Sequence, residues 1–190
     1  MGEAMLNSWH AWFGTFTGVA ALTLLSLPVA AVTAAVLGWR RKAAGTASPW
    51  RLSFADVGMV HGTVPWVWMV LLPGEHPGVE RGPLNLVPLR DLLEMDTGQV
   101  VGNLFIFAAL GFFAPQRFAA LASLPRVLAL AGGWSALLEI TQYLWLDRVS
   151  SVDDVLLNAA GAGLAALASR RWWRRPAELH EDTAVICRAG

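Results

Sequence analysis

Acidic and amide side chains lie within, or at the start of, otherwise apolar segments of this chain. Glu139 lies in the middle of one apolar run, Asn103 lies near the start of another, and Asp154 and Asn158 open a third. A charged carboxylate is costly in hydrocarbon, so ionisable residues in such segments usually have a function. We therefore begin from the chemistry that these side chains could perform.

Paired carboxylates beside arginines could support acid–base chemistry on a membrane substrate. If the protein is an enzyme, Glu139 would be the general acid and Asp154, kept ionised by Arg148, the base. Arg90 could hold a phosphate or carboxylate with its planar guanidinium group. The same residues could instead form a salt-bridge network, with Glu139 paired to Arg90 or Arg148. The chain contains no HExxH, GxSxG or glycine-rich phosphate loop, so we favour a protein that is not an enzyme.

The composition predicts an all-α, polytopic membrane bundle that positions these residues. Of the 190 residues 55% are hydrophobic and only 15% are charged, whereas about a quarter are charged in a typical soluble domain. A helix needs about 20 apolar residues to cross a bilayer. About five segments reach or approach this length: 13–37, 54–72, 100–117, 127–146 and 153–169.

Several classes of site and segment are excluded. Cys187 is the single cysteine, and the four histidines are dispersed, so we expect no internal disulfide, no metal site and no cofactor. The formal net charge is zero, which gives no indication of a nucleic-acid partner. Arg40-Arg41-Lys42 follows the first segment, a stop-transfer pattern that predicts a retained helix rather than a signal peptide.

The distribution of basic residues predicts the orientation of the bundle. Eleven of the fourteen Lys and Arg residues follow the first, third or fifth segment, which puts them on one side of the membrane. Arg81, Arg90 and Arg148 lie on the other side. The positive-inside rule then places the N-terminus outside and the C-terminus in the cytoplasm.

This orientation brings the polar residues together near the outer surface. Gln142 is three residues after Glu139, and Asn158 is four residues after Asp154, so each pair shares a helix face. We expect a ligand-binding pocket in the outer leaflet. Its candidate residues are Asn85, Arg90, Asn103, Glu139, Gln142, Arg148, Asp153, Asp154 and Asn158.

The long connection 73–99 contributes the first two of these residues. Its centre, 84–93, is too apolar for an ordinary solvated loop. We expect an interfacial or re-entrant element between the second and third helices that caps the bundle from outside. Such backbone is tolerated at membrane depth only where protein or a wet cavity surrounds it.

Four short sequence blocks resemble a known family. In chain order they are Asn85-x-x-Pro88-x-Arg90, Asn103-x-x-x-Phe107-x-x-x-Gly111-Phe112-x-x-Pro115, Leu137-Leu138-Glu139-x-x-Gln142 and Arg148-x-x-Ser151-x-Asp153-Asp154-x-x-x-Asn158-x-x-Gly161. Their order and spacing over about 54–168 resemble the VanZ-like family of small bacterial membrane proteins. The resemblance implies a multi-pass protein of the bacterial cytoplasmic membrane. It also implies an association with resistance to teicoplanin, without the peptidoglycan-remodelling enzymes of vancomycin-type resistance.

Each candidate also has a structural interpretation. Asp153 and Asp154 could stabilise the first turn of a helix, with Ser151 as its cap. Arg148 could anchor at the interface by snorkelling. The amides could form interhelical hydrogen bonds, and the glycines could allow close helix packing. These amides are Asn103, Gln142 and Asn158, and these glycines are Gly111, Gly161 and Gly163.

Three functions remain open for a single membrane domain at 1–175 with an exposed cytoplasmic tail at 176–190. The first is a pocket that binds or excludes an amphiphile, either a lipid-linked cell-wall precursor or a lipoglycopeptide. The second is an outer-leaflet enzyme that uses Glu139, Asp154 and Arg90. The third is an accessory subunit that packs against its partner through 161–163. The lipid bilayer is the partner common to all three.

Overall fold

The computed structural model describes residues 15–73, 77–79 and 83–173, and this part of the chain is predominantly helical. The all-α expectation is therefore confirmed. The helices are α2 (Phe16–Leu25), α3 (Leu27–Ala43), α4 (Pro49–Val70), α5 (Thr97–Ile106), α6 (Ala108–Arg117), α7 (Leu124–Trp145) and α8 (Val152–Ser169). The described part also contains three 3₁₀ turns and two short strands. The turns are η1 (Asp91–Leu93), η2 (Ala119–Leu121) and η3 (Arg170–Trp172), and the two-residue strands are β1 (Leu84–Asn85) and β2 (Ser150–Ser151).

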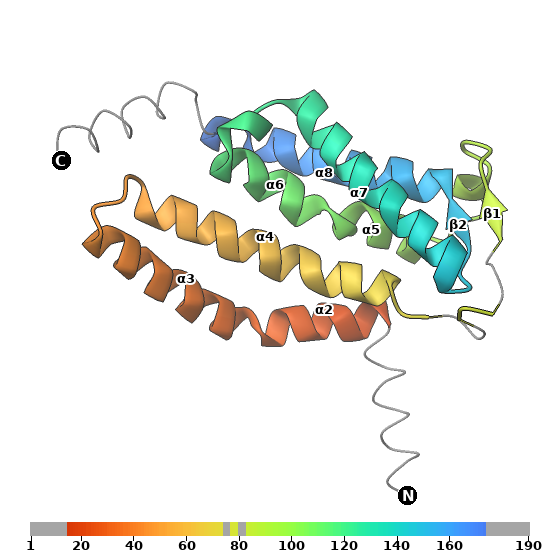
Figure 1. Ribbon diagram of the computed structural model, residues 1–190, viewed down its shortest axis with the longest axis horizontal. Coiled ribbons are helices and arrows are strands. Elements are labelled where there is room, and N and C mark those ends of the chain that lie inside the picture. The colour runs from red at the N-terminus through yellow and green to blue at the C-terminus, as the bar shows by residue number, and fades with distance from the viewer. Residues whose placement is uncertain (1–14, 74–76, 80–82, 174–190) are drawn as a thin grey trace, which may run out of the picture.

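The helices run roughly along one long axis, so the bundle has two distinct ends (Figure 1). Helix α8 packs against α5, α6 and α7, and α4 packs against α3 and α6. At one end α4 and α7 finish while α5 and α8 begin, and the two short strands lie there as well. We call this end the strand end.

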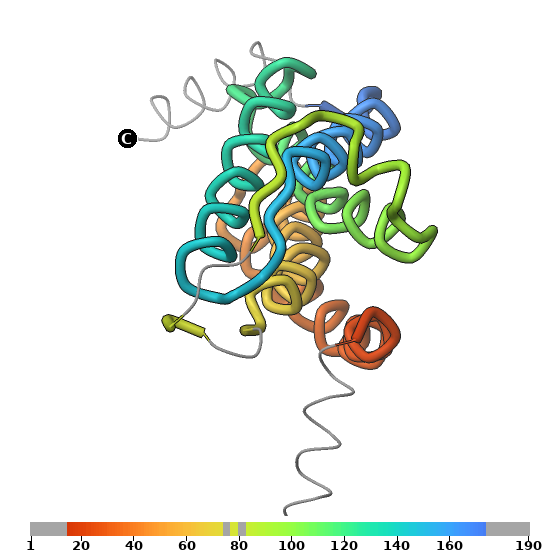
Figure 2. Tube along the Cα trace, turned by 90° about the vertical axis from the view of Figure 1, so that its right-hand side faces the viewer, coloured from red at the N-terminus to blue at the C-terminus, as the bar shows by residue number. Residues whose placement is uncertain are grey.

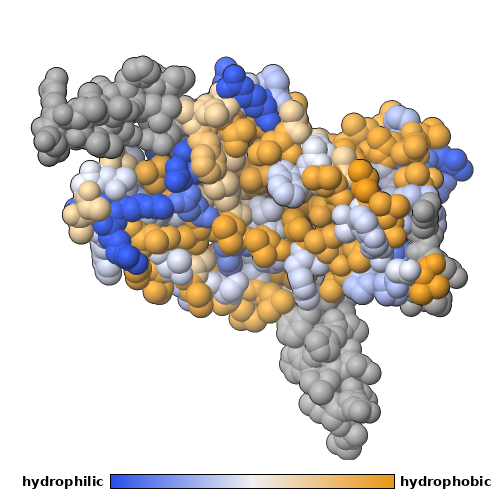
Figure 3. Space-filling model, viewed as in Figure 1, coloured by the Kyte–Doolittle hydropathy of each residue, from blue (hydrophilic) through white to orange (hydrophobic). Residues whose placement is uncertain are grey.

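The outer surface of the bundle is strongly apolar. Large hydrophobic side chains are exposed on successive turns of its helices, including Val29, Val36, Trp134 and Leu164. Figure 3 shows apolar residues over most of one face of the molecule. A helix that is apolar toward both core and surroundings is typical of a membrane span. The chain is therefore a membrane protein with multiple candidate spans.

Three helical stretches are long and apolar enough to cross a membrane: Thr97–Arg117, Leu124–Trp145 and Val152–Trp172. There are four such spans in the described residues if the bent pair α2 and α3 counts as one. Within the described residues all five expected segments are helical, but α4 is less apolar than the other spans and is not among the helices apolar enough to cross a membrane. Its Asp56 lies inside the helix and accepts hydrogen bonds from Arg41 at 2.6 Å and Arg117 at 2.7 Å.

The bend between α2 and α3 has a local cause. Pro28 lies in the first turn of α3, where its ring replaces a backbone N–H and crowds the carbonyl four residues earlier. Ser26 is therefore both the C-cap of α2 and the N-cap of α3, and the axes of the two helices differ by 43°. The expected first segment is thus a kinked pair that continues to Ala43 and includes Arg40-Arg41-Lys42.

Glycines allow the helices beneath the apolar surface to approach closely. A Cβ at Gly161 would lie 2.0 Å from the carbonyl oxygen of Leu104, and one at Gly111 would lie 2.1 Å from that of Ala162. A Cβ at Gly163 would lie 2.8 Å from Leu128. The expected packing role of these glycines is confirmed. However, they face the chain's own helices, so the suggestion that 161–163 forms a docking face for a partner is wrong.

Residues 83–96, which lead into α5, cross the ends of the helices beside β2, as the end-on view in Figure 2 shows. β1 and β2 pair in parallel, with Leu84 opposite Ser150 and Asn85 opposite Ser151. The side chains of Leu86, Val87 and Leu93 point away from the protein and are exposed. Residues 83–96 therefore cover the strand end at its surface, and we call them the cap.

We expect Gly161→Ala to destabilise the protein because the new methyl group would overlap backbone, which cannot move aside as a flexible side chain can. Overpacking typically costs about 1–3 kcal/mol, and the rigid contact favours the upper part of this range. Thermal unfolding in a mild detergent measures the change. Gly133→Ala in α7 is the control, because nothing lies within 4 Å of its added Cβ. Equal stability of the two variants would contradict the close α5–α8 contact.

Candidate functional site

A cavity of about 1040 Å³ opens at the strand end of the bundle. Residues from α2, α4, α5, α7 and α8 and from the cap segment line it. Its polar lining includes Asn85, Arg90, Asp91, Glu94, Asp96, Gln99, Asn103, Glu139, Gln142, Arg148, Ser151, Asp154 and Asn158. Its apolar lining includes Phe16, Met69, Val70, Leu84, Met95, Ile106, Leu138 and Val149.

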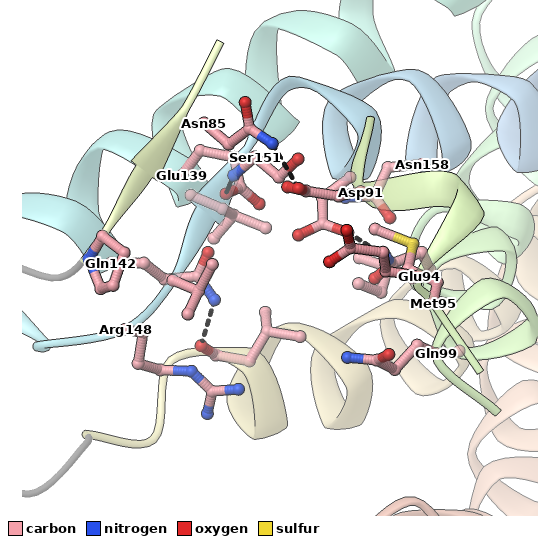
Figure 4. Close-up of a pocket in the computed structure, with 18 of the residues that line it drawn as sticks. Asn85, Asp91, Glu94, Met95, Gln99, Glu139, Gln142, Arg148, Ser151 and Asn158 are labelled. Atoms are coloured by element: carbon pink, nitrogen blue, oxygen red, sulfur yellow. Dashed lines mark hydrogen bonds between the residues drawn. The ribbon is translucent and has the colours of Figure 1, made fainter. Parts of the chain in front are cut away.

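Eight of the nine residues predicted as a ligand-binding set line this one cavity, and Asp153 is the exception. Figure 4 shows Glu139, Gln142, Arg148 and Ser151 on one side of the open space and Gln99 on the opposite side. The sequence spacing predicts only that the candidate residues lie near one end of their helices. The fold in addition arranges eight of them around a single cavity.

Asp153 instead holds the cap segment in place. Its Oδ1 accepts a hydrogen bond from the backbone N–H of Leu89 at 2.6 Å. Its Oδ2 accepts from the N–H groups of Asp91 at 2.9 Å and Leu92 at 3.0 Å. The side chain is 1% exposed, and these bonds use both of its oxygens. Asp153 also lies in the first turn of α8, where Ser151 accepts from its N–H at 3.2 Å, so its structural interpretation is supported.

Asn85 shapes the cap from the other side. Its amide nitrogen donates to the carboxylate of Asp91, and its oxygen accepts from the N–H of Val87 at 3.0 Å. Such a side-chain bond to the backbone two residues on is typical of an Asx turn. Because β1 pairs Asn85 with Ser151, the cap is fixed to the start of α8 at two places.

Glu139 contacts the turn between α7 and α8. Its Oε2 accepts from the N–H of Ser151 at 2.9 Å, while the Ser150 hydroxyl donates to its backbone carbonyl at 2.8 Å. Within the described residues neither Arg90 nor Arg148 forms an ion pair with Glu139, so the predicted salt bridge is wrong. The tight α7–α8 turn brings a backbone donor to the carboxylate instead.

Arg148 and Gln142 connect α7 to the end of α4. Arg148 donates to the carbonyl of Leu72 at 3.2 Å, and Gln142 donates to that of Val70 at 2.8 Å. The last carbonyls of a helix have no partner within it, and a cation is favourable there. Arg90, by contrast, is an exposed side chain of the cap that lines the cavity.

The remaining amides join helices across the cavity wall. Asn103 on α5 donates to the carboxylate of Asp154 on α8, and Asn158 on α8 donates to the Ser135 hydroxyl on α7 at 2.7 Å. The interhelical interpretation of Asn103, Gln142 and Asn158 is therefore confirmed. The Oδ1 of Asn158 is buried and, among the described residues, has no hydrogen-bond partner.

Several lining residues were missing from the predicted set. Asp91, Glu94 and Met95 belong to the cap, and Asp96 and Gln99 begin α5. The sequence contains a signal for Asp96 and Gln99, because Asp96-x-x-Gln99 is the pattern of a helix-capping box. In the structure the Asp96 carboxylate accepts from the N–H of Gln99 at 3.0 Å, and the Gln99 side-chain oxygen accepts from the N–H of Asp96 at 3.2 Å. The capping box places the start of α5 at Thr97, three residues before the expected boundary, and turns both side chains toward the cavity.

The cavity combines an excess of acidic groups with an apolar wall. Carboxylates of five residues line it (Asp91, Glu94, Asp96, Glu139 and Asp154), against two arginines. Among these seven side chains, all of them described, no ion pair is found, whereas Asp56 at the other end of the bundle pairs with Arg41 and Arg117. In the described part of the chain no group of His, Cys, Asp or Glu is arranged to hold a metal ion. The cavity thus presents charged and amide groups beside apolar side chains.

Comparison with known proteins identifies the family. A family model described as VanZ/LLP1 matches residues 62–173, which is more than half of the chain. The match includes α5, α7, α8 and the cap, which line most of the cavity, but not α2. A comparison with curated proteins and another with solved structures each found no significant match.

We expect Asp153→Ala to release the cap and to destabilise the protein by about 3 kcal/mol or more, because three backbone donors lose a charged acceptor. Hydrogen–deuterium exchange should show faster exchange at the amides of Leu89, Asp91 and Leu92. Asp154→Ala is the matched control, since it removes the neighbouring carboxylate, which bonds to Asn103 and not to the cap. If the cap amides stay protected in Asp153→Ala, the clamp described above is not what holds the segment.

Proposed function

We propose, from the premise that this chain belongs to the VanZ/LLP1 family, that it binds an amphiphile in the cavity at the strand end of its bundle. The ligand is a lipid-linked envelope precursor or a lipoglycopeptide, whose head group the polar side chains receive. By binding it, the protein sequesters or excludes the molecule at the outer leaflet of the bacterial cytoplasmic membrane. This role accords with the association of VanZ-like proteins with teicoplanin resistance.

The observation that carries the proposal is the mixed lining of the cavity. Head-group partners such as Glu139 and Asn103 share it with apolar side chains such as Phe16, Ile106 and Leu138. The volume of about 1040 Å³ is at the upper end of the range typical of small-molecule sites, roughly 300–1,000 Å³. A soluble polar ligand would not need the apolar wall, whereas an acyl-chained ligand would use both parts.

The outward orientation of the cavity is supported by the charges at the two ends of the bundle. Arg40, Arg51, Arg117 and Arg170 lie at helix ends opposite the strand end. Basic residues are favoured on the cytoplasmic side, so we propose that the strand end faces outward, with the N-terminus outside and the C-terminus inside. This arrangement requires α4 to cross the membrane as a fifth span, shielded by α3 and α6, against which it packs.

An enzyme acting on a lipid-linked substrate is the second candidate. It is favoured by one observation, that Glu139 and Asp154 line the same cavity as Arg90. Glu139 would then act as acid, Asp154 as base and Arg90 as the group that holds a phosphate. Incubation of the purified protein with lipid-linked precursors, followed by product analysis, distinguishes this candidate from a binding protein.

We expect cells that express the protein to tolerate more teicoplanin, while their susceptibility to vancomycin stays unchanged, because only the former carries an acyl chain. Glu139→Gln should abolish this protection at equal membrane levels. Gln retains an oxygen to accept the Ser151 bond, so the variant removes the charge and keeps the turn between α7 and α8. Inhibitory concentrations of both antibiotics measure the effect.

The outcomes separate the parts of this proposal. Protection by the wild type and not by the variant supports the cavity as the functional site. Equal protection by both would show that the Glu139 charge has no role in binding. If neither protects, the lipoglycopeptide is not the ligand, and the lipid-linked precursor remains to be tested by direct binding.

A further inference from the structure

We propose that the cavity recognises an ammonium group on the head group of its amphiphilic ligand, and that Glu139, Asp154 and the Oδ1 of Asn158 receive it. This inference rests on the proposed function and specifies the chemical class of the ligand. It departs from the expectation, drawn from Arg90, of a phosphate or carboxylate. Three observations carry it: the charge of the lining, the commitment of its arginines and an unused buried acceptor.

The charge of the cavity favours a cation. Five residues with carboxylates line it, and in the described part of the chain none of them forms an ion pair with an arginine. An anionic head group would meet these carboxylates at short range in a partly desolvated space, where repulsion is strong. A cationic head group would be attracted by the same charges.

The two arginines of the lining are poorly placed to reverse this preference. Arg148 donates to the carbonyl of Leu72 at the end of α4. Arg90 belongs to the exposed cap and lies at the surface of the molecule. Arg148 lies near enough to attract the carboxylates of Glu139 and Asp154, but it forms no ion pair with either of these described residues.

Asn158 supplies an observation that is independent of the acidic residues. It is 1% exposed and lines the cavity (Figure 4), and its Nδ2 donates to Ser135. Its Oδ1 has no donor among the described residues. A buried acceptor without a partner costs free energy, and a donor on the ligand would remove this cost.

The carboxylates retain acceptor capacity of their own. Glu139 accepts from Ser151 through Oε2, and the Ser150 hydroxyl lies beside the carboxylate but donates its hydrogen to the Glu139 carbonyl. A carboxylate has about four acceptor sites, so Glu139 can accept further hydrogen bonds. Asp154 accepts from Asn103 through Oδ1, which leaves Oδ2. An ammonium group has three donors and no acceptor, so it matches three acceptors contributed by α7 and α8.

The test measures binding of three probes with the same chain to the full-length protein in a neutral detergent. The probes are n-dodecylammonium, N-dodecylacetamide, which lacks the charge, and n-dodecyl phosphate, which reverses it. We expect dodecylammonium to bind about tenfold or more tightly than the others, and Glu139→Gln and Asp154→Asn each to remove about tenfold of its affinity.

Asp147→Asn is the matched control. It makes the same charge change at the same end of the bundle, outside the cavity lining. Its φ of 49° is left-handed, a conformation that Asn tolerates as Asp does. We expect unchanged affinity for dodecylammonium. A loss equal to that of Glu139→Gln would mean that general surface charge attracts the probe, and would overturn the proposal.

The failure of this inference can be distinguished from failure of the proposed function. Tighter binding of dodecyl phosphate, lost in Arg148→Gln, would overturn the ammonium preference and leave the amphiphile cavity standing. Gly102→Trp places a large side chain in the lining beside Phe16. If this variant binds all three probes as the wild type does, the cavity is not the binding site and both proposals fail.

Two further competitors identify the source of the ammonium group. Phosphatidylethanolamine represents a membrane lipid, and teicoplanin represents a glycopeptide. Displacement of dodecylammonium by one of them supports the proposal and names the source. The proposal would be overturned if neither competitor displaced dodecylammonium, while the anionic lipid phosphatidylglycerol displaced it equally from the wild type and from Glu139→Gln.

Discussion

The carboxylate of Asp153 is the interaction on which the strand end depends. A segment that leaves regular structure must satisfy its backbone groups elsewhere, and the cap does so partly through this one buried side chain. Its three bonds join residues 61 to 64 positions apart in sequence. With the cap fixed there, Asn85 reaches Ser151 in the short ladder, and the cavity gains the wall that closes it from one side.

This dependence explains why two adjacent acids have different tasks. Asp153 and Asp154 both lie in the first turn of α8, where negative charge is favourable. A helix turns by about 100° between neighbours, so one side chain faces the cap while the other faces α5. The carboxylate oxygens of Asp153 both accept hydrogen bonds from backbone N–H groups of the cap. Asp154 lines the cavity and accepts a hydrogen bond from Asn103. Of the two acids, Asp153 is thus part of the scaffold, and Asp154 remains the candidate for function.

The sequence was sufficient for the helices and for the level at which the polar residues lie. Apolar length and helical spacing predicted these features, because each is a local property of the sequence. Partners were not predictable in the same way. Glu139 bonds to Ser151 rather than to an arginine because of the geometry of a tight turn, and Arg148 turns to Leu72 because α4 ends beside it. Glu94 and Met95 reach the cavity only through the path of the cap. Such contacts depend on how distant segments are arranged in three dimensions, and residue spacing along the chain does not predict this arrangement.

The two ends of the bundle treat buried charge in opposite ways. At the basic end Asp56 is neutralised by both Arg41 and Arg117, as expected for a carboxylate whose role is to join α3, α4 and α6. At the strand end Arg90 and Arg148 line the same cavity as Glu139 and Asp154, yet none of these four described residues forms an ion pair with another. Stability alone would favour pairing, since an uncompensated charge near hydrocarbon is unfavourable. Backbone and amide donors hold these acceptors in place without neutralising them, as the proposed binding of a cationic head group requires. On that proposal the ligand supplies the complementary charge that the protein itself does not provide, and the fixed acceptors lower the cost of binding.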